Sequence, residues 1–272
     1  MKKLFALLMV GAMAFGATAC SKSDAGNTEQ KETNEQNGEE AQGGAADGKV
    51  YQIATDTTFA PFEFQDADGN FVGIDIDLLA AIAEDQGFQY NLQPLGFSAA
   101  VAAMESGQAD GVIAGMSITE KRQESYDFSE PYYNSGVGMA VKADNDEIQS
   151  YADLSGKTVA VKTGTEGATF AESIADEYGF TLAYFEESPY MYEDVKTGNS
   201  AACFEDYPVL GYGIAQGNGL KMVGEMEQGS SYGFAVLKGN CPELIEMFNA
   251  GLQNLKDNGK YQEILDKYIS VE

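Results

Sequence analysis

Residues 136–144 read GVGMAVKAD, and a second segment of similar character, YGFAVLKGN, follows at residues 232–240. Both segments are strand-like and flanked by small residues, and the sequence between them has its own alternation of strands and helices. If both cross between two α/β lobes, the second lobe is inserted into the first and is joined to it by two hinge strands. Two lobes connected in this way form a cleft that can close by hinge bending.

The sequence before the first of these segments alternates apolar strands with helices. Strands are predicted at 50–56 (VYQIATD), 88–95 and 109–116, and helices at 75–87 (DIDLLAAIAEDQG) and 97–108. Asp75 or Asp77 is expected to cap the first helix, and Gly87 to end it. This order of elements predicts a mainly parallel α/β sheet.

The same rhythm restarts after residue 156. A strand is predicted within KTVAVKTGTEG (157–167), a helix at 168–179, further strands at 181–185 and 200–206, and C-terminal helices at 242–259 and 261–269. The predicted fold is therefore α/β, with two mainly parallel lobes. Lobe 1 comprises 49–134 and 232–272, and lobe 2 comprises 135–231.

The N-terminus indicates export from the cytoplasm. Residues 1–19 have a basic start, an apolar run and small residues before Cys20, which fits a secretory signal too short to span a membrane. A Cys in this position resembles the bacterial lipoprotein signal, although Ala17 stands where that signal usually has Leu. We therefore expect a lipid anchor at Cys20 on the outer face of the cell membrane, the alternative being ordinary secretion with an incidental Cys.

Residues 20–48 follow as a polar, acidic segment. Beyond Cys20 they contain no aromatic or large aliphatic side chain, so they cannot bury enough apolar surface to fold and are expected to form a flexible tether. The whole chain carries a formal net charge of −27, from 43 acidic and 16 basic residues. This charge argues against nucleic acid or an anionic membrane surface as the partner.

Several other kinds of site are excluded or disfavoured. The chain has no His, which removes His-based catalytic triads and most zinc sites, and neither a metal nor another cofactor is expected. Residues 66–70 (DADGN) lack the spacing of a Ca²⁺ loop and predict a hairpin turn, and KTGTEG lacks the spacing of a phosphate-binding loop. Cys203 and Cys241 lie in different predicted elements, which favours two separate thiols.

Five motifs carry a resemblance to a known family. They are ATDTTFAPFEF, VGIDIDLLAAIA, GMSITEKRQESYDFSEPYY, GKTVAVKTGT and NGKYQEILDKY, in this order. They resemble the polar amino-acid solute-binding proteins of ABC importers, closest to the glutamine-binding and the lysine/arginine/ornithine-binding proteins. The resemblance implies the type II periplasmic-binding-protein fold, a monomer, and delivery of the ligand to an ABC permease and its ATPase subunits.

The resemblance also implies which residues hold the backbone of a free amino acid. Arg122 of SITEKR would bind the carboxylate through its two-donor fork, and Asp206 would pair with the ammonium. In the family, the groups at the positions of Ser117 and of the Gly115 backbone bind the ammonium and the carboxylate of the ligand. Without the resemblance, Arg122 bridging to Glu120 or Asp127 on a solvated turn fits the sequence as well.

Two aromatic residues are expected to enclose the aliphatic part of the ligand. Phe59 and Phe97 fall at strand-to-helix junctions of the first lobe, and ligands of open α/β sheets bind at the carboxyl ends of the strands. The family places aromatic residues at both positions. Phe62 and Phe64 are expected to belong to the core.

Three charged residues bear on the choice of ligand. Asp56 matches a family position that accepts a hydrogen bond from the nitrogen at the end of the ligand side chain. Lys162 matches the pattern of the glutamine-binding proteins, and its positive charge disfavours a cationic ligand. Glu205 replaces a His beside Asp206 and would repel a distal carboxylate. Together they predict a neutral polar side chain, glutamine first. Lysine or arginine comes second, and requires Lys162 to be paired with one of the acids.

Glu166 departs from the family pattern. It stands where relatives carry Gly or Thr near the ligand carboxylate, and an ionised Glu aimed at that carboxylate would cost several kcal/mol. We predict that its side chain points away and that Thr165 supplies a hydroxyl to the ligand.

Two other classes of function compete with a binding protein. A dehydratase of the same fold, acting on a prephenate-like acid, could recruit Asp56, Glu205 or Glu166 as general acid or base. The combination of Arg122, Ser117 and Asp206 instead fits an intact amino-acid backbone, so no enzymatic activity is expected. A receptor sensor domain is disfavoured because no helix able to span a membrane is predicted after Val50.

Overall fold

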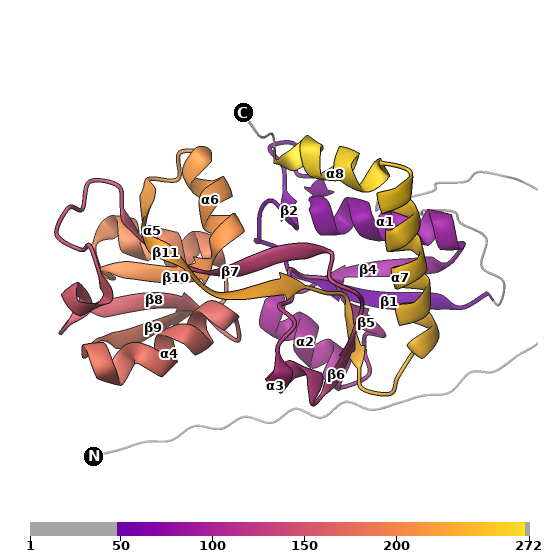
Figure 1. Ribbon diagram of the computed structural model, residues 1–272, viewed down its shortest axis with the longest axis horizontal. Coiled ribbons are helices and arrows are strands. Elements are labelled where there is room, and N and C mark those ends of the chain that lie inside the picture. The colour runs from indigo at the N-terminus through magenta and orange to yellow at the C-terminus, as the bar shows by residue number, and fades with distance from the viewer. Residues whose placement is uncertain (1–47, 270–272) are drawn as a thin grey trace, which may run out of the picture. The chain divides into compact units, whose positions relative to one another are not determined.

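The computed structural model describes residues 48–269, arranged around two five-stranded sheets (Figure 1). The predictions for the signal peptide, Cys20 and the tether through residue 47 lie outside the described residues.

The first sheet has the strand order β4-β1-β5-β12-β6. Its strands are β1 (Val50–Thr55), β4 (Gln89–Pro94), β5 (Gly111–Val112), β6 (Tyr126–Phe128) and β12 (Ala235–Leu237). The first three are parallel, whereas β12 runs antiparallel to both β5 and β6. Its helices are α1 (Ile74–Gln86), α2 (Phe97–Glu105), α3 (Glu120–Gln123), α7 (Pro242–Asp257) and α8 (Lys260–Tyr268). A hairpin of β2 (Phe64–Gln65) and β3 (Phe71–Val72) confirms the turn predicted at 66–70.

The second sheet has the order β11-β7-β10-β8-β9. Its strands are β7 (Tyr133–Lys142), β8 (Thr158–Lys162), β9 (Thr181–Phe185), β10 (Ala202–Asp206) and β11 (Leu220–Tyr232). Strands β8, β9 and β10 are parallel, and β7 and β11 add antiparallel strands at one edge. The 3₁₀ helix η1 (Tyr151–Leu154) and helices α4 (Glu166–Tyr178), α5 (Ser188–Thr197) and α6 (Tyr207–Ala215) belong to this lobe. The two sheets confirm the predicted fold class of two mainly parallel α/β lobes.

The two strands that connect the lobes differ in part from the prediction. The first is β7, as expected, but it begins at Tyr133. The second is β11, which ends at Tyr232, where the predicted segment 232–240 begins, and that segment contributes β12 to the first sheet instead. Strand β11 pairs with β7 through irregular register between Val223 and Ser230. Its sequence is polar and rich in Gly and Ser, so it lacked the apolar pattern used to predict strands.

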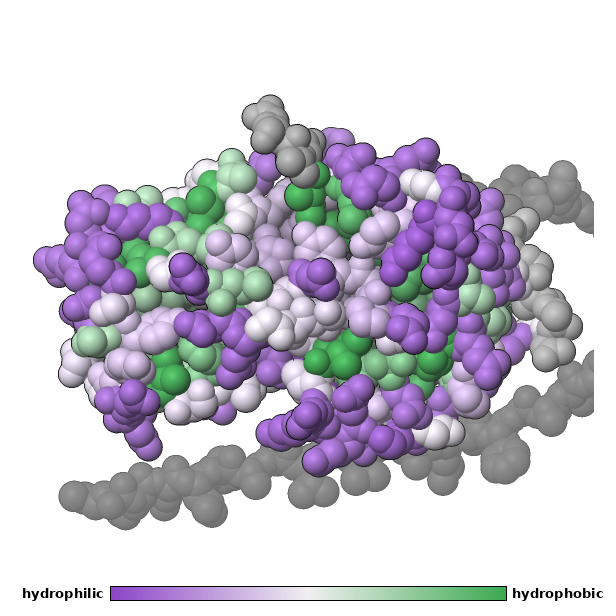
Figure 2. Space-filling view, in the orientation of Figure 1, coloured by the Kyte–Doolittle hydropathy of each residue, from purple (hydrophilic) through white to green (hydrophobic). Residues whose placement is uncertain are grey.

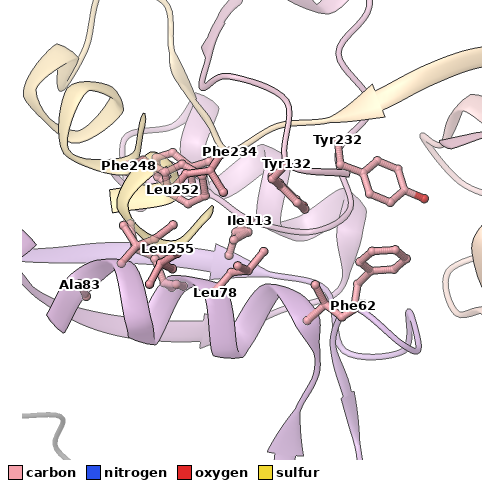
Figure 3. Packing of buried hydrophobic residues seen from close by; sticks show 14 of the residues in the cluster. Phe62, Leu78, Ala83, Ile113, Tyr132, Tyr232, Phe234, Phe248, Leu252 and Leu255 are labelled. Carbon is pink, nitrogen blue, oxygen red and sulfur yellow. The ribbon is translucent and has the colours of Figure 1, made fainter. Parts of the chain in front are cut away.

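The core of the first lobe joins segments that are far apart in the chain. Leu78 of α1, Phe248 of α7 and Ile113 after β5 pack in one buried cluster (Figure 3). Phe62 and Tyr232 lie at one end of this cluster, with ring centroids 4.9 Å apart and the rings nearly perpendicular. The strand that returns from the second lobe is therefore anchored in the core of the first.

The start of α1 was predicted incorrectly. Its N-cap is Gly73, which makes no side-chain cap, and neither Asp75 nor Asp77 caps the helix. A Cβ at Gly73 would overlap the carbonyl of Phe62, so glycine is required by this close approach. Asp77 instead accepts hydrogen bonds from Lys267 and Tyr268, whereas Asp75 is fully buried.

Other expectations concern the cysteines and the surface. Cys203 and Cys241 are both free thiols, as predicted. Among residues 48–269, no helix combines the length and the apolar character needed to cross a bilayer. Hydrophilic residues dominate the two ends of the face shown in Figure 2, with hydrophobic residues in smaller groups between them, in keeping with the acidic composition.

Candidate ligand-binding site

A narrow cavity lies where the two lobes meet, with about 250 Å³ of empty space when the part open to solvent is included. Nine of the ten predicted ligand-binding residues line it: Asp56, Phe59, Phe97, Gly115, Ser117, Arg122, Lys162, Thr165 and Asp206. Ala114 and Glu166 complete the lining, and the tenth predicted residue, Glu205, lies behind the wall. The fold thus brings nine of these residues, which are distant in the sequence, into one cavity.

The positions of these residues follow from the topology of the sheets. Asp56 follows β1 in the first lobe, whereas Lys162 and Asp206 are the last residues of β8 and β10 in the second. Strand ends of both sheets therefore face the same cavity, as expected for open α/β sheets. Phe97 is the first residue of α2, and its ring lies 5.5 Å from the guanidinium carbon of Arg122.

The guanidinium of Arg122 is held in place by both lobes. The Thr119 side chain caps α3 by accepting from the Arg122 N–H, which fixes the backbone there. Nη1 donates to the Ser117 carbonyl at 2.9 Å, and Nη2 donates to the Gly164 carbonyl of the second lobe at 3.1 Å. Burial lowers the pKa of Arg122, opposed by Glu166 and Asp206. Arginine remains charged under these conditions, so the fork retains its attraction for an anion.

The prediction that the Glu166 side chain points away from the cavity is wrong. Its carboxylate lies 3.5 Å from Nη2 of Arg122, and both side chains are mostly buried. The reason is that α4 begins at Glu166, which places its side chain beside the guanidinium. Arg122 is therefore paired within the chain, with an acid other than Glu120 or Asp127.

The hydroxyl of Thr165 is engaged by the backbone. It donates to the Lys162 carbonyl at 2.8 Å and accepts from the Ala168 N–H as the N-cap of α4. The residue lines the cavity, but its hydroxyl hydrogen is used to shape the loop. The sequence predicts instead that this hydroxyl binds the ligand.

Lys162 and Asp56 form an ion pair between the lobes. The ammonium of Lys162 donates to Oδ2 of Asp56, and both side chains are about 1% exposed. Burial acts to lower the pKa of Lys162, but Asp56 and Glu205 outweigh it and the pKa is raised. Lys162 therefore stays protonated, and its ammonium also lies 5.1 Å from the ring centroid of Phe59.

Glu205 supports this pair from behind the cavity wall. Its carboxylate accepts from the Ser188 hydroxyl at 2.7 Å and from the Asp206 N–H at 3.2 Å. Burial raises its pKa, whereas Lys162 and Ser188 lower it. Its charge acts on the site through Lys162, and the side chain itself does not line the cavity.

Asp206 faces the cavity with one oxygen already engaged. Its Oδ2 accepts from the Tyr232 hydroxyl at 2.5 Å, and that hydroxyl in turn accepts from Ser135 at 3.0 Å. Burial and the neighbouring Glu205 raise the pKa of Asp206 to about 7, against the lowering effect of Tyr232 and Arg122. Sequence reasoning missed Tyr232, because nothing in its local motif distinguishes it from a core tyrosine.

The remaining predicted residues form the first-lobe wall. Phe59 and Phe97 are 4% and 6% exposed, so their rings leave little access for water. Gly115 has φ 52°, and a Cβ there would collide with the ring of Phe59. The Ser117 hydroxyl accepts from Ser230 at 3.3 Å. Within residues 48–269, no group of three acids or cysteines is arranged to hold a metal ion.

Comparison with known proteins places this geometry in a family. Residues 51–271 match the family described as bacterial extracellular solute-binding proteins, family 3. The arginine-binding extracellular protein ArtP of Bacillus subtilis is 29% identical over 100% of both chains.

Two solved structures show the same fold. Substrate-binding domain 2 of Lactococcus lactis GlnP, in an open conformation, is 44% identical over 85% of this chain and 100% of that one, with a TM-score of 0.58. An ancestral arginine-binding protein bound to glutamine is 37% identical over 81% and 97%, with a TM-score of 0.74.

The arrangement of the lobes agrees with the ligand-bound relative. The TM-score is higher with the glutamine-bound structure than with the open one, although the sequence identity is lower. Hydrogen bonds across the cleft, from Arg122 to Gly164 and from Ser98 to Thr163, also indicate a closed arrangement. With its type II periplasmic-binding-protein fold and its matched length, the chain belongs to the bacterial extracellular solute-binding proteins of family 3.

Proposed function

We propose that this protein captures a free polar amino acid, glutamine first, by closure of its two lobes, and delivers it to an ABC permease. The observation that carries the proposal is that Arg122 of one lobe and Asp206 of the other face a single cavity. A zwitterion placed between them has both charges paired, which offsets the cost of removing them from water. The Arg122 fork suits the carboxylate, and Asp206 suits the ammonium.

The pair of Lys162 and Asp56 supports glutamine as the ligand. A side-chain amide presents a carbonyl acceptor and an N–H donor at the same end. The ammonium of Lys162 can donate to the carbonyl, and the carboxylate of Asp56 can accept from the nitrogen. A ligand with a distal carboxylate would meet Asp56, and a ligand with a distal cation would meet Lys162.

Arginine or lysine is a second candidate, favoured by one specific observation. A basic ligand requires that Lys162 be paired with an acid. Lys162 is paired with Asp56, and Glu205 lies nearby. Acids also outnumber cations around the site: Asp56, Glu166, Glu205 and Asp206 against Arg122 and Lys162. The arginine-binding name of ArtP supports the same candidate.

The acids near the cavity argue against the dehydratase. Asp56 is paired with Lys162, Glu166 with Arg122, and Glu205 is hydrogen-bonded to Ser188. A general base must be free to take a proton from the substrate. We therefore propose a binding protein without catalytic activity.

The cellular setting is part of the proposal. We propose that the chain is exported and anchored through lipid on Cys20 to the outer face of a bacterial membrane, with residues 20–48 as a tether. It would act as a monomer whose partners are the permease and ATPase subunits of an importer. Labelling with a radioactive fatty acid, compared between wild type and Cys20→Ala, tests the anchor; equal labelling would refute it.

Calorimetric titration against all twenty amino acids tests the function, after bound ligand has been removed by partial unfolding. We expect glutamine to bind most tightly, and Arg122→Ala to weaken its binding by about 2–5 kcal/mol. Lys121→Ala, an exposed neighbour in α3, serves as the control and should bind as wild type does. Preference for arginine would select the second candidate. Turnover of prephenate without amino-acid binding would reject both.

A further inference from the structure

A pair of buried acids lies directly behind the first-lobe wall of the cavity. Glu63 and Asp75 are both 0% exposed, and most of their carboxyl oxygens have no hydrogen-bond donor among the described residues. An ionised carboxylate has only acceptors, so two buried acids cannot give each other a partner while both are ionised. A proton on one of the two would supply the missing donor.

The other contacts of the pair identify which acid holds the proton. Oδ2 of Asp75 accepts from the Gly115 N–H and from the Tyr132 hydroxyl, both at 2.8 Å. Within the described part of the chain, neither oxygen of Glu63 nor Oδ1 of Asp75 has a nitrogen or hydroxyl donor. A proton on Glu63, donated to Oδ1 of Asp75, would give a partner to that oxygen and to one oxygen of Glu63. Buried polar atoms without a partner would otherwise cost about 1–3 kcal/mol each.

The pair is connected to the cavity by two routes. Asp75 fixes the peptide between Ala114 and Gly115, and both of these residues line the cavity. The backbone of Glu63 pairs with that of Phe59, which lines the cavity as well. We propose that Glu63 and Asp75 share one buried proton and act as positioning residues, which hold the Gly115 turn and Phe59 against the ligand.

The surrounding charges favour this state. Burial raises the pKa of Glu63 well above its ordinary value, and the charges of Asp75 and Asp56 raise it further, against Lys162. Burial raises the pKa of Asp75 to about 6, while Gly115, Tyr132 and Glu63 lower it. Near neutral pH, Glu63 is therefore neutral and Asp75 is ionised. The neutral form of Glu63 keeps another negative charge away from Asp56.

Proton release on unfolding tests the shared proton without any ligand. At pH 7 in weak buffer, wild type should release about one more proton on unfolding than Glu63→Gln, because unfolded Glu ionises and Gln cannot. Glu84→Gln, on the exposed face of α1, is the matched control and should match wild type. Equal proton release by wild type and Glu63→Gln would overturn the proposal.

Ligand titration tests the positioning role, which rests on the proposed function. Glu63→Gln keeps a neutral donor to Asp75, so glutamine should bind within about threefold of wild type, whereas Glu63→Ala should weaken binding about fivefold or more. Asp75→Asn should weaken it similarly, with Asp77→Asn in the same helix unchanged. If Glu63→Ala binds as Glu63→Gln does, the positioning role is wrong. Failure of wild type to bind any amino acid would reject the proposed function, and the proton count would still stand.

Discussion

At the scale of single residues, two groups proposed to bind the ligand are already paired with acidic side chains of the protein. Glu166 sits beside the guanidinium proposed to bind the ligand carboxylate, and Asp56 holds the ammonium proposed to meet the distal group. The affinity then depends on how readily these internal pairs yield to the ligand. Substitution of the internal partner separates this competition from direct contact with the ligand.

Glu166→Gln should raise the affinity for glutamine. The change removes the repulsion between this acid and the ligand carboxylate and releases Arg122, so we expect about a five- to thirtyfold gain, or about 1–2 kcal/mol. Calorimetric titration at low ionic strength measures it. Glu172→Gln is the control, because that residue is exposed in the same helix and accepts a hydrogen bond from Tyr184 on the surface. Weaker binding by Glu166→Gln would mean that Glu166 assists the ligand.

Lys162→Ala should shift selectivity toward arginine. The substitution leaves Asp56 without its buried partner, and an unpaired carboxylate favours a cationic ligand. We expect the ratio of arginine to glutamine affinity to rise about tenfold or more, which corresponds to about 1.4 kcal/mol. Lys221→Ala, whose partner Asp146 is exposed, provides the control. An unchanged ratio would remove the pair of Lys162 and Asp56 from the specificity of the site.

Binding should weaken in acid through Asp206. Its pKa is about 7, and only the ionised form attracts the ligand ammonium. Affinity should therefore rise with pH and level off near pH 8, and at pH 5.5 it should lie about thirtyfold below that plateau. Titrations at several pH values check this profile. Asp206→Asn should bind weakly and with little pH dependence; a steep profile in that variant would assign the effect to another group.

At the scale of elements, close helix packing outweighs helix propensity in lobe 1. Gly251 of α7 faces α1, where an added Cβ would lie 2.8 Å from a methyl carbon of Ile82. Gly211 of α6 is different, because its added Cβ would meet only the terminal carbon of Met222 at 3.6 Å. The same substitution should thus have opposite effects in the two helices.

Gly211→Ala should stabilise the protein by about 0.5–1 kcal/mol, the usual gain in a helix interior. Gly251→Ala should destabilise it by about 1–2 kcal/mol, because the overlap with Ile82 exceeds that gain. Equilibrium unfolding in urea measures both. If Gly251→Ala is as stabilising as Gly211→Ala, then α1 and α7 have room between them and the core is less tightly packed than described.

At the scale of the whole molecule, the buried acids determine how stability depends on pH. The pKa values of Glu63, Asp75, Glu205 and Asp206 are all raised by burial. The folded state therefore binds more protons than the unfolded state at neutral pH, so stability rises as the pH falls. The net charge of −27 acts in the same direction, because acid reduces self-repulsion.

The melting temperature should accordingly be higher at pH 5.5 than at pH 8, by roughly 5 °C or more. Acid should therefore raise the melting temperature but lower the ligand affinity. Because the two effects have opposite signs, the effect of pH on stability can be separated from its effect on the binding site. Scanning calorimetry of ligand-free protein gives the comparison. A higher melting temperature at pH 8 would mean that surface ion pairs outweigh the buried acids.

Most of the fold could be predicted from the sequence, for a physical reason, whereas the candidate site residues came from the family resemblance. Apolar periodicity marks strands such as 50–56 and helices such as 242–259. Asp56 and Asp206 were identified by the family resemblance, and the sheet topology brings them together. Contacts between distant residues could not be predicted in this way. Three features depend on tertiary neighbours: the pairing of Glu166 with Arg122, the hydrogen bond from Tyr232 to Asp206, and the strand β11.

The most direct test is a crystal structure of the protein with glutamine bound. The ligand carboxylate should lie within hydrogen-bonding distance of the Arg122 guanidinium, its ammonium should contact Asp206, and its amide should lie between Lys162 and Asp56. A ligand bound outside the cavity, or oriented with its ammonium toward Arg122, would contradict the account.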